Sequence, residues 1–225
     1  NEMRLYVLHK THYSYPSPVR NSCNELRLSP LSNDWQKCIT CFVSVFPTTK
    51  TSQYLDLNGN LVHYFEIPED HSHLTIESRS TTTTSKRVDF GNFPYGVPMR
   101  SLKEVESSPE ARPYLQSSHF VDITPEIWRQ AVEIQGDSKD VFQTAYQIME
   151  FVYLNYEYCV STTSVDTHVS EVLKKRKGVC QDFAHAVIAL CRCLGIPARY
   201  VSGYFYDSSR DQIMRGGGAS HAWVE

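Results

Sequence analysis

The sequence predicts an α+β protein with a β-rich first part and a mainly helical second part. Short apolar and β-branched segments separated by turn residues fill residues 1–80, as is typical of antiparallel strands. Apolar residues at helical spacing begin after Thr124. We therefore expect a β-rich N-terminal domain over residues 1–80, a linker or irregular segment over residues 81–124, and a core domain over residues 125–225.

The strands expected in the first domain are short and bounded by turn residues. Pro16 and Pro18 are expected to end the first strand, because proline cannot donate to a ladder of hydrogen bonds. Asn58-Gly59-Asn60 is the strongest hairpin signal in the chain. Short strands separated by turns predict an antiparallel, sandwich-like arrangement. The expected strands cover residues 5–9, 25–28, 38–45, 61–67 and 74–78.

The second part carries helix start and stop signals. Ser107 and Pro109 predict a short helix, since serine caps helices and proline fits their first turn. Thr124 followed by Pro125 predicts a capped helix start. Further helices are expected over residues 141–153, 169–175 and 180–194, the last of them ended by Gly195. Two strands, over residues 198–206 and 219–225, are expected to follow.

The composition excludes several classes of function. A formal net charge of −3 leaves no basic surplus for a polyanion, so no nucleic-acid partner is expected. No segment approaches the roughly 18 to 20 apolar residues that a membrane-spanning helix needs, so no membrane partner is expected. Seven cysteines are an odd number in a chain without an apolar signal-peptide core. They predict reduced thiols and a cytoplasmic location.

Cys180 is the first candidate catalytic residue, because it stands at the expected start of a helix. A free thiol has a pKa of about 8.5, and the partial positive charge at a helix N-terminus favours the thiolate. Gly178 allows close backbone approach just before the helix. The backbone N–H of Cys180, or its neighbour Gln181, is a candidate oxyanion donor.

His221 is the second candidate, since strand alternation can direct its imidazole toward the start of that helix. A nearby imidazolium would lower the pKa of the Cys180 thiol further. Ala222 is small and leaves room, and Trp223 is expected to share the face of His221 and to wall the site.

Other cysteines and a further histidine of the chain have simpler structural interpretations. Cys191 and Cys193, late in an apolar helix, are expected to be small buried hydrophobes, as most single cysteines are. His185 is expected to be a satisfied structural histidine, with a supporting role at the site as the alternative. Cys38 and Cys41 have CxxC spacing, but no second metal-ligand pair follows at zinc-finger distance. Their segment is better explained as a core strand, and no metal site is expected.

Three blocks of the second part resemble the transglutaminase-like superfamily. They are GVCQDFAH at residues 178–185, GIPAR at 195–199 and SHAWVE at 220–225, in the order and spacing of that core. The first 80 residues resemble the β-rich N-terminal region of bacterial members. The segments that carry this second match are YSY at 13–15, PV at 18–19, NELRLSP at 24–30 and DLNGN at 56–60.

The resemblance implies a papain-like core, with helices packed on an antiparallel sheet, and a Cys-His-Asp triad. Cys180 falls on the nucleophile and His221 on the base. The aspartate is expected beyond Glu225, and since the chain ends four residues after His221 we expect the core to be incomplete at its C-terminal end.

The resemblance also implies the chemistry, and it leaves alternatives open. A peptidase or amidase that forms an acyl-enzyme on Cys180 is the first hypothesis. Acyl transfer from protein glutamine to amines, or a non-catalytic binding or scaffold module, are the alternatives. The substrate would be a peptide or an amide. No cofactor is expected, and the sequence contains no EF-hand-like calcium loop.

Overall fold

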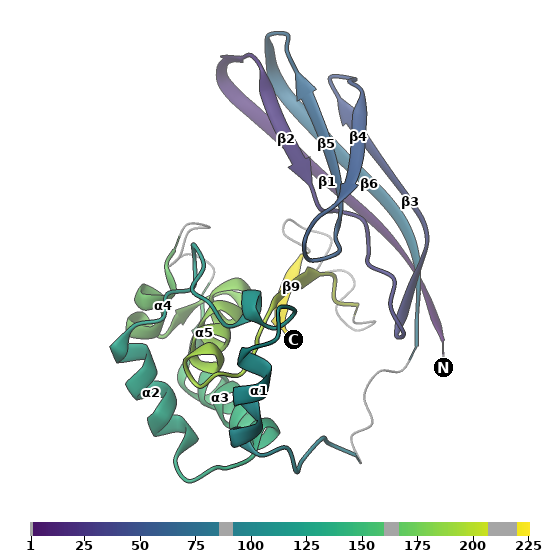
Figure 1. The fold of residues 1–225 in the computed structure, drawn as a ribbon. Coiled ribbons are helices and arrows are strands. Elements are labelled where there is room, and N and C mark those ends of the chain that lie inside the picture. Colours follow the sequence, from purple (N-terminus) through teal and green to yellow (C-terminus); the bar gives the residue numbers. More distant parts are fainter. Residues whose placement is uncertain (1, 86–91, 160–166, 207–219) are drawn as a thin grey trace. The chain divides into compact units, whose positions relative to one another are not determined.

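The chain divides into two compact units, Asn1–Asp89 and Phe90–Glu225 (Figure 1). The computed structural model of the protein describes residues 2–85, 92–159, 167–206 and 220–225. No helix in these ranges is both long and apolar enough to cross a membrane.

The first unit contains two antiparallel three-stranded sheets (Figure 1). In one sheet, β6 (His71–Thr84) lies between β1 (Met3–Val19) and β3 (Gln36–Phe46). In the other, β5 (Leu61–Ile67) lies between β2 (Ser22–Leu26) and β4 (Thr51–Leu55). A shared core of buried side chains joins the two central strands, and it consists of Phe65, Ile67, Leu74 and Ile76. The β-rich, sandwich-like prediction is confirmed.

Pro16 and Pro18 do not end the first strand, so this prediction was wrong. β1 runs through both prolines to Val19. The ladder to β6 is interrupted there instead, because the pairing shifts between Ser14, opposite His73, and Val19, opposite His71. The prolines fall in this irregular stretch, where an N–H donor is not required for pairing.

The hairpin predicted at Asn58-Gly59-Asn60 connects β4 to β5. Gly59 has a φ of +76°, a conformation that glycine adopts without steric cost. Asp56 Oδ1 accepts hydrogen bonds from the backbone N–H groups of Asn58 and Asn60, both at 2.9 Å. The carboxylate therefore holds the turn from inside, as Asx turns do.

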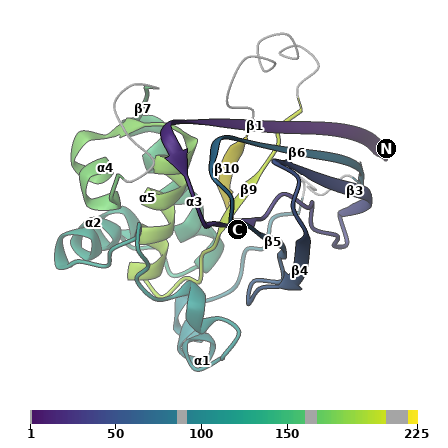
Figure 2. The ribbon, with the colours of Figure 1, turned by 90° about the horizontal axis from the view of Figure 1, so that it is seen from above.

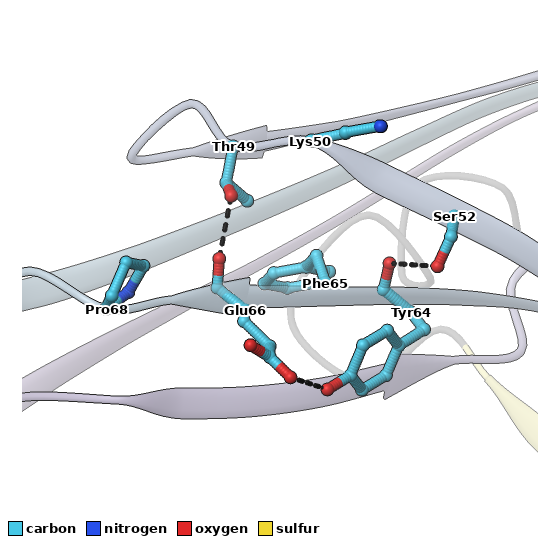
Figure 3. Close-up of a pocket in the computed structure, with 7 residues that line it drawn as sticks. All are labelled: Thr49, Lys50, Ser52, Tyr64, Phe65, Glu66 and Pro68. Atoms are coloured by element: carbon cyan, nitrogen blue, oxygen red, sulfur yellow. Dashed lines mark hydrogen bonds between the residues drawn. The ribbon is translucent and has the colours of Figure 1, made fainter.

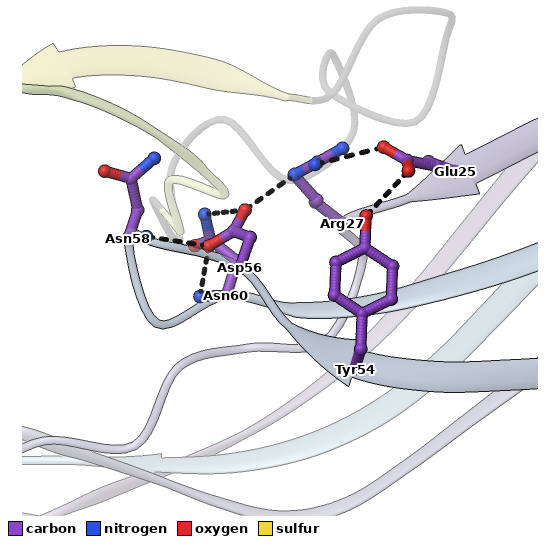
Figure 4. Close-up of polar contacts among 6 residues, drawn as sticks. All are labelled: Glu25, Arg27, Tyr54, Asp56, Asn58 and Asn60. Atoms are coloured by element: carbon purple, nitrogen blue, oxygen red, sulfur yellow. Dashed lines mark hydrogen bonds and ion pairs between the residues drawn. The ribbon is translucent and has the colours of Figure 1, made fainter.

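The same carboxylate belongs to a polar network on the sheet of β2 and β4 (Figure 4). Arg27 Nε donates to Asp56 Oδ2 at 2.9 Å, and Arg27 also pairs with Glu25 at 3.2 Å. Tyr54 donates its hydroxyl to Glu25 at 2.6 Å. Hydrogen bonds from Asn60 and Arg27 hold the pKa of Asp56 well below its usual range. The network links β2 and β4 across the central strand β5 and fixes the hairpin.

The second unit is organised around α5 (Cys180–Cys193), which packs against three helices and a strand (Figures 1 and 2). The helices are α2 (Pro125–Gln135), α3 (Val141–Asn155) and α4 (Val169–Lys175). The strand is β10 (His221–Val224), which pairs antiparallel with β9 (Tyr200–Gly203). Fully buried side chains fill the space between these elements: Ile148, Val169, Val172, Ile188 and Leu190.

The predicted helix starts are confirmed at two places. Thr124 caps α2 by accepting a hydrogen bond from Ile127 N at 3.3 Å, and Pro125 is the first helical residue. Asp140 caps α3 by accepting from Gln143 N at 2.9 Å. Both caps satisfy an N–H group that the helix itself leaves unpaired.

The segment predicted as a linker contains short elements. β6 extends to Thr84, and the described residues beyond it include the 3₁₀ turn η1 (Met99–Ser101), the helix α1 (Leu102–Glu106) and the 3₁₀ turn η2 (Arg112–Tyr114). The prediction of a helix starting at Ser107 was wrong. Ser107 instead follows the last residue of α1 as its C-cap.

The last strands are shorter than the sequence suggested. Of the strand expected over residues 198–206, only Tyr200–Gly203 pairs with β10. β10 begins at His221, and Ala219 lies outside the described residues. α5 ends at Cys193, close to the predicted end, and Gly195 follows with a φ of +76°.

Candidate active site

Cys180 is the first residue of α5, as predicted. Val179 precedes the helix in an extended conformation, and its carbonyl accepts the first helical hydrogen bond, from Phe183 N at 3.1 Å. The N–H of Cys180 therefore lies before the first intrahelical bond and points out of the helix start. A half-buried thiol at this position combines a nucleophile with a nearby backbone donor.

The backbone just before Cys180 is held by a short parallel ladder. β7 (Glu157–Tyr158) pairs with β8 (Lys177–Gly178), with Tyr158 opposite Gly178. Cys159 N donates to Gly178 O at 2.8 Å, which continues this pairing toward the helix. The residues that lead into the nucleophile are thus anchored to a strand that lies about 20 residues earlier in the chain.

His221 is the first residue of β10 and lies opposite Gly203 of β9. Its imidazole contacts the ring of Phe205 at 6.4 Å between centroids. Among the described residues, no hydrogen bond or ion pair joins His221 to Cys180. α5 and β10 pack together, but the approach of the imidazole to the thiol stays a prediction.

Trp223 shares a face of β10 with His221, as strand alternation requires. Its indole lies across Gly203, since a Cβ added to that glycine would come within 2.5 Å of Trp223 Cη2. Val224, on the alternate face, packs against the helical core. The indole therefore lies over the backbone opposite His221, and its role as a wall of the site stays a prediction.

Gln181 is the second residue of α5 and is half-buried. Its position in the first helical turn is compatible with the oxyanion role expected from the sequence. That role stays a prediction.

His185 is buried, with 6% of its surface exposed, between two aromatic rings. The ring of Phe120 stacks on it at 5.6 Å and 10°, and that of Tyr200 lies at 5.2 Å and 39°. Its Nδ1 is buried without a hydrogen-bond partner among the described residues. The histidine predicted to be structural is therefore buried and stacked against Phe120, and the expectation that its hydrogen bonds are satisfied stays a prediction.

We expect His185 to make the stability of the second unit fall at acidic pH. Burial lowers its pKa below the ordinary value of 6.5, and Arg192 acts in the same direction while Asp182 opposes both. The unfolded chain therefore binds the proton more readily than the folded chain. The neutral imidazole makes its whole contribution to the free energy of unfolding above pH 6.5, and this contribution is lost as the pH falls below 6.5. The free energy of unfolding in urea should differ less between pH 5 and pH 7.5 in His185→Phe than it does in the wild type. An unchanged difference would contradict this, and the exposed His12→Phe serves as control.

Tyr200 is a site residue that the sequence did not reveal. Its pKa is raised by burial first, and then by the proximity of Cys180 and Asp182. It is the first residue of β9, and its ring lies tilted against that of His185, so it lies beside the first turns of α5. The only sequence signal was its position directly after the GIPAR block.

The two other cysteines of α5 are less suited to catalysis. Cys191 is 3% exposed, and burial raises its pKa to about 12. Burial also raises the pKa of Cys193 to about 11. Both therefore remain protonated thiols at neutral pH. Cys191 is buried as predicted, whereas Cys193 is only half-buried.

The CxxC segment, Cys38 to Cys41, lies in β3. Cys41 contacts the hydroxyls of Ser29 at 3.4 Å and Ser78 at 3.8 Å, and a β-bulge separates it from Cys38. In the part of the chain that the structure describes, no three His, Cys, Asp or Glu side chains are grouped to hold a metal ion. The segment forms a strand as predicted, but the prediction of a core strand was wrong: β3 lies at the edge of its sheet, Cys38 and Cys41 are only half-buried, and Ile39 and Phe42 are exposed.

A pocket of about 400 Å³ opens on the sheet of β4 and β5 in the first unit (Figure 3). Tyr64 donates a short hydrogen bond to Glu66, and Thr49 donates to Glu66 O at 2.7 Å. The lining holds no cysteine or histidine, so it lacks the pair of groups proposed for Cys-His catalysis. It consists of Thr49, Lys50, Ser52, Tyr64, Phe65, Glu66 and Pro68.

Comparisons with known proteins agree with this arrangement. A family model described as the transglutaminase-like superfamily matches residues 129–225, and one described as the bacterial transglutaminase-like N-terminal region matches residues 5–83. An uncharacterized protein of Mycobacterium leprae is 30% identical over 224 residues, which cover 99% of this chain and 78% of that protein. An uncharacterized protein of Mycobacterium tuberculosis is 30% identical over 231 residues, covering 98% of this chain and 72% of that protein.

A solved structure shares the fold. It is described as "a Putative Cysteine Protease from Cytophaga hutchinsonii". The match has a TM-score of 0.77 and 23% sequence identity, and it covers 100% of this chain and 73% of that one.

Proposed function

This chain belongs to the transglutaminase-like superfamily, and from that premise we propose that it hydrolyses peptide or amide bonds through an acyl-enzyme on Cys180. The observation that carries the proposal is the position of Cys180 as the first residue of α5, with its backbone N–H ahead of the first helical hydrogen bond. A thiol there gains from the helix dipole and has an oxyanion donor beside it.

In the proposed reaction the Cys180 thiolate attacks the carbonyl carbon of the scissile amide. The carbonyl oxygen takes the negative charge of the tetrahedral intermediate and accepts a hydrogen bond from the N–H of Cys180. His221 gives a proton to the leaving amine as the C–N bond breaks, which leaves a thioester. His221 then takes a proton from water, which attacks the thioester and releases the acid. The residue that orients His221 is proposed to lie beyond Glu225.

Mass spectrometry of the protein after incubation with amide substrates tests the proposal. A panel of peptide amides and glutamine peptides, each with and without a primary amine, should give a transient mass increase on Cys180 and release of the free acid. Products that carry the amine would instead support acyl transfer. Unmodified Cys180 and intact substrates across the panel would contradict both chemistries and favour a binding module.

The proposed partner is a peptide or amide substrate, without nucleic acid or membrane. The proposed compartment is the cytoplasm, where a thiol nucleophile stays reduced. All seven cysteines lie in described residues, and no disulfide joins any of them. A cell fractionation that finds the protein outside the cytoplasm would overturn this location.

A further inference from the structure

We infer that Asp182 is a positioning residue, whose buried carboxylate fixes the backbone turn that presents Cys180 at the start of α5. Only the effect of Asp182 on catalysis rests on the proposed function; its effect on the backbone does not. The turn itself is defined by contacts of Gly178 and Val179 with Asp182 and with β7, and none of these contacts involves the side chain of Cys180 or His221.

The carboxylate of Asp182 is buried and bonded to the backbone. The residue is 1% exposed, and its Oδ2 accepts a hydrogen bond from Val179 N at 2.8 Å. Asp182 occupies the third position of α5 and reaches back to the residue that precedes the helix, as the acidic residue of a capping box does. The side chain of Val179 is a hydrocarbon and cannot return the bond. The polar side-chain contribution at this helix start therefore comes from Asp182.

The same side chain also determines which residue can stand two positions before the nucleophile. A Cβ added to Gly178 would lie 2.5 Å from Asp182 Oδ2 and 2.7 Å from Asp182 Cβ, closer than real side chains approach. Gly178 is needed here because of this contact, and its carbonyl is held on the other side by Cys159 N. The backbone entering α5 is thus fixed between β7 and the carboxylate.

These constraints converge on Cys180. Gly178 is fixed by the ladder and by its contact with Asp182, and Val179 is fixed by its hydrogen bond to Asp182. Cys180 follows directly, so the direction of its N–H and its Sγ depends on this turn. Loss of the acceptor would leave the Val179 N–H unpaired in a half-buried position, and such a group relaxes by local rearrangement or by opening to water.

Asp182→Ala and Asp182→Asn separate the hydrogen bond from the charge. Asparagine keeps an oxygen that can accept from Val179 N, whereas alanine removes the acceptor. Asp140→Ala is the control, because Asp140 also accepts a backbone hydrogen bond at a helix start, as the N-cap residue of α3 bonded to Gln143 N at 2.9 Å, but does not belong to this turn.

Two readouts on the intact chain test the inference. Hydrogen exchange of the Val179 amide should accelerate about tenfold in Asp182→Ala, because its acceptor is gone. The pH profile of iodoacetamide alkylation at Cys180 should shift in the same variant. Asp182→Asn should retain both properties of the wild type, and Asp140→Ala should lower the unfolding temperature without altering either.

The inference would be overturned if Asp182→Ala kept the wild-type exchange rate of Val179 and the wild-type alkylation profile of Cys180. It would also be overturned if Asp182→Asn changed both readouts as much as Asp182→Ala, or if Asp140→Ala altered the alkylation of Cys180 as much as Asp182→Ala does. If Asp182→Ala does not fold, the exchange rate of the Val179 amide in Asp182→Asn tests the inference instead. An amide that stays protected from exchange supports the inference, and an amide that loses this protection contradicts it. A slow, ordinary Cys180 in the wild type would argue against the proposed function, whereas the exchange of Val179 still tests the role of Asp182.

Discussion

Replacing Cys180 with alanine is expected to lower amide hydrolysis by at least about 1000-fold, because removal of a catalytic nucleophile costs enzymes this much or more. The fold should be retained. Cys180 is only half-buried at the first position of α5, and alanine is the best helix former. The measurement is kcat/KM on the best substrate of the panel, together with the circular dichroism spectrum of the variant.

Cys193→Ala is the matched control for this variant. Cys193 is also half-buried and ends the same helix, so its loss removes a thiol from α5 without touching the site. Its activity should equal that of the wild type. Acyl transfer that persists in Cys180→Ala would show that another group is the nucleophile.

His221→Ala is expected to lower kcat/KM by about 100- to 10 000-fold, the usual contribution of a general acid-base residue. Cys180 should still be acylated slowly, since the thiolate also forms without the imidazole as the pH rises. Burst kinetics with an activated ester would separate acylation from deacylation, because both steps are expected to slow. Full activity of His221→Ala would assign the proton transfers to a different residue.

The sequence predicted best those features that depend on local residues. Asn58-Gly59-Asn60 marked its hairpin because glycine adopts a positive φ, and Thr124-Pro125 marked the start of α2 because a cap and a first-turn proline act within four residues. The start of α5 at Cys180 was also predicted. Such signals do not depend on the rest of the fold.

The features that were missed depend on contacts between distant segments. The prolines of β1 are accommodated by a register shift against β6, about 55 residues away in the chain, which no local rule reveals. The ring contacts of His185 with Phe120 and Tyr200 join α5 to the loop before α2 and to β9. Asp182 is the third residue of the helix, a position where an acidic residue can bond back to the N-cap backbone. The sequence did not indicate a capping box there, because valine rather than serine or threonine precedes the helix.

The candidate site was predicted in part. Cys180 is located as expected, at the start of a helix that packs against the strand of His221. The distance between thiol and imidazole depends on tertiary placement of β10, and this cannot be read from alternation along the strand alone. Strand alternation did predict that Trp223 shares a face with His221, and the contact of its indole with Gly203 agrees with this.

The alkylation rate of every cysteine, followed against pH and assigned by mass spectrometry, tests the central claim most directly. If Cys180 is an activated nucleophile, it should react at least about tenfold faster at pH 7 than the exposed Cys23. Cys191 and Cys193 should react slowest, since burial raises the pKa of both. A Cys180 that reacts no faster than Cys23 across the pH range would contradict an activated thiol at the start of α5.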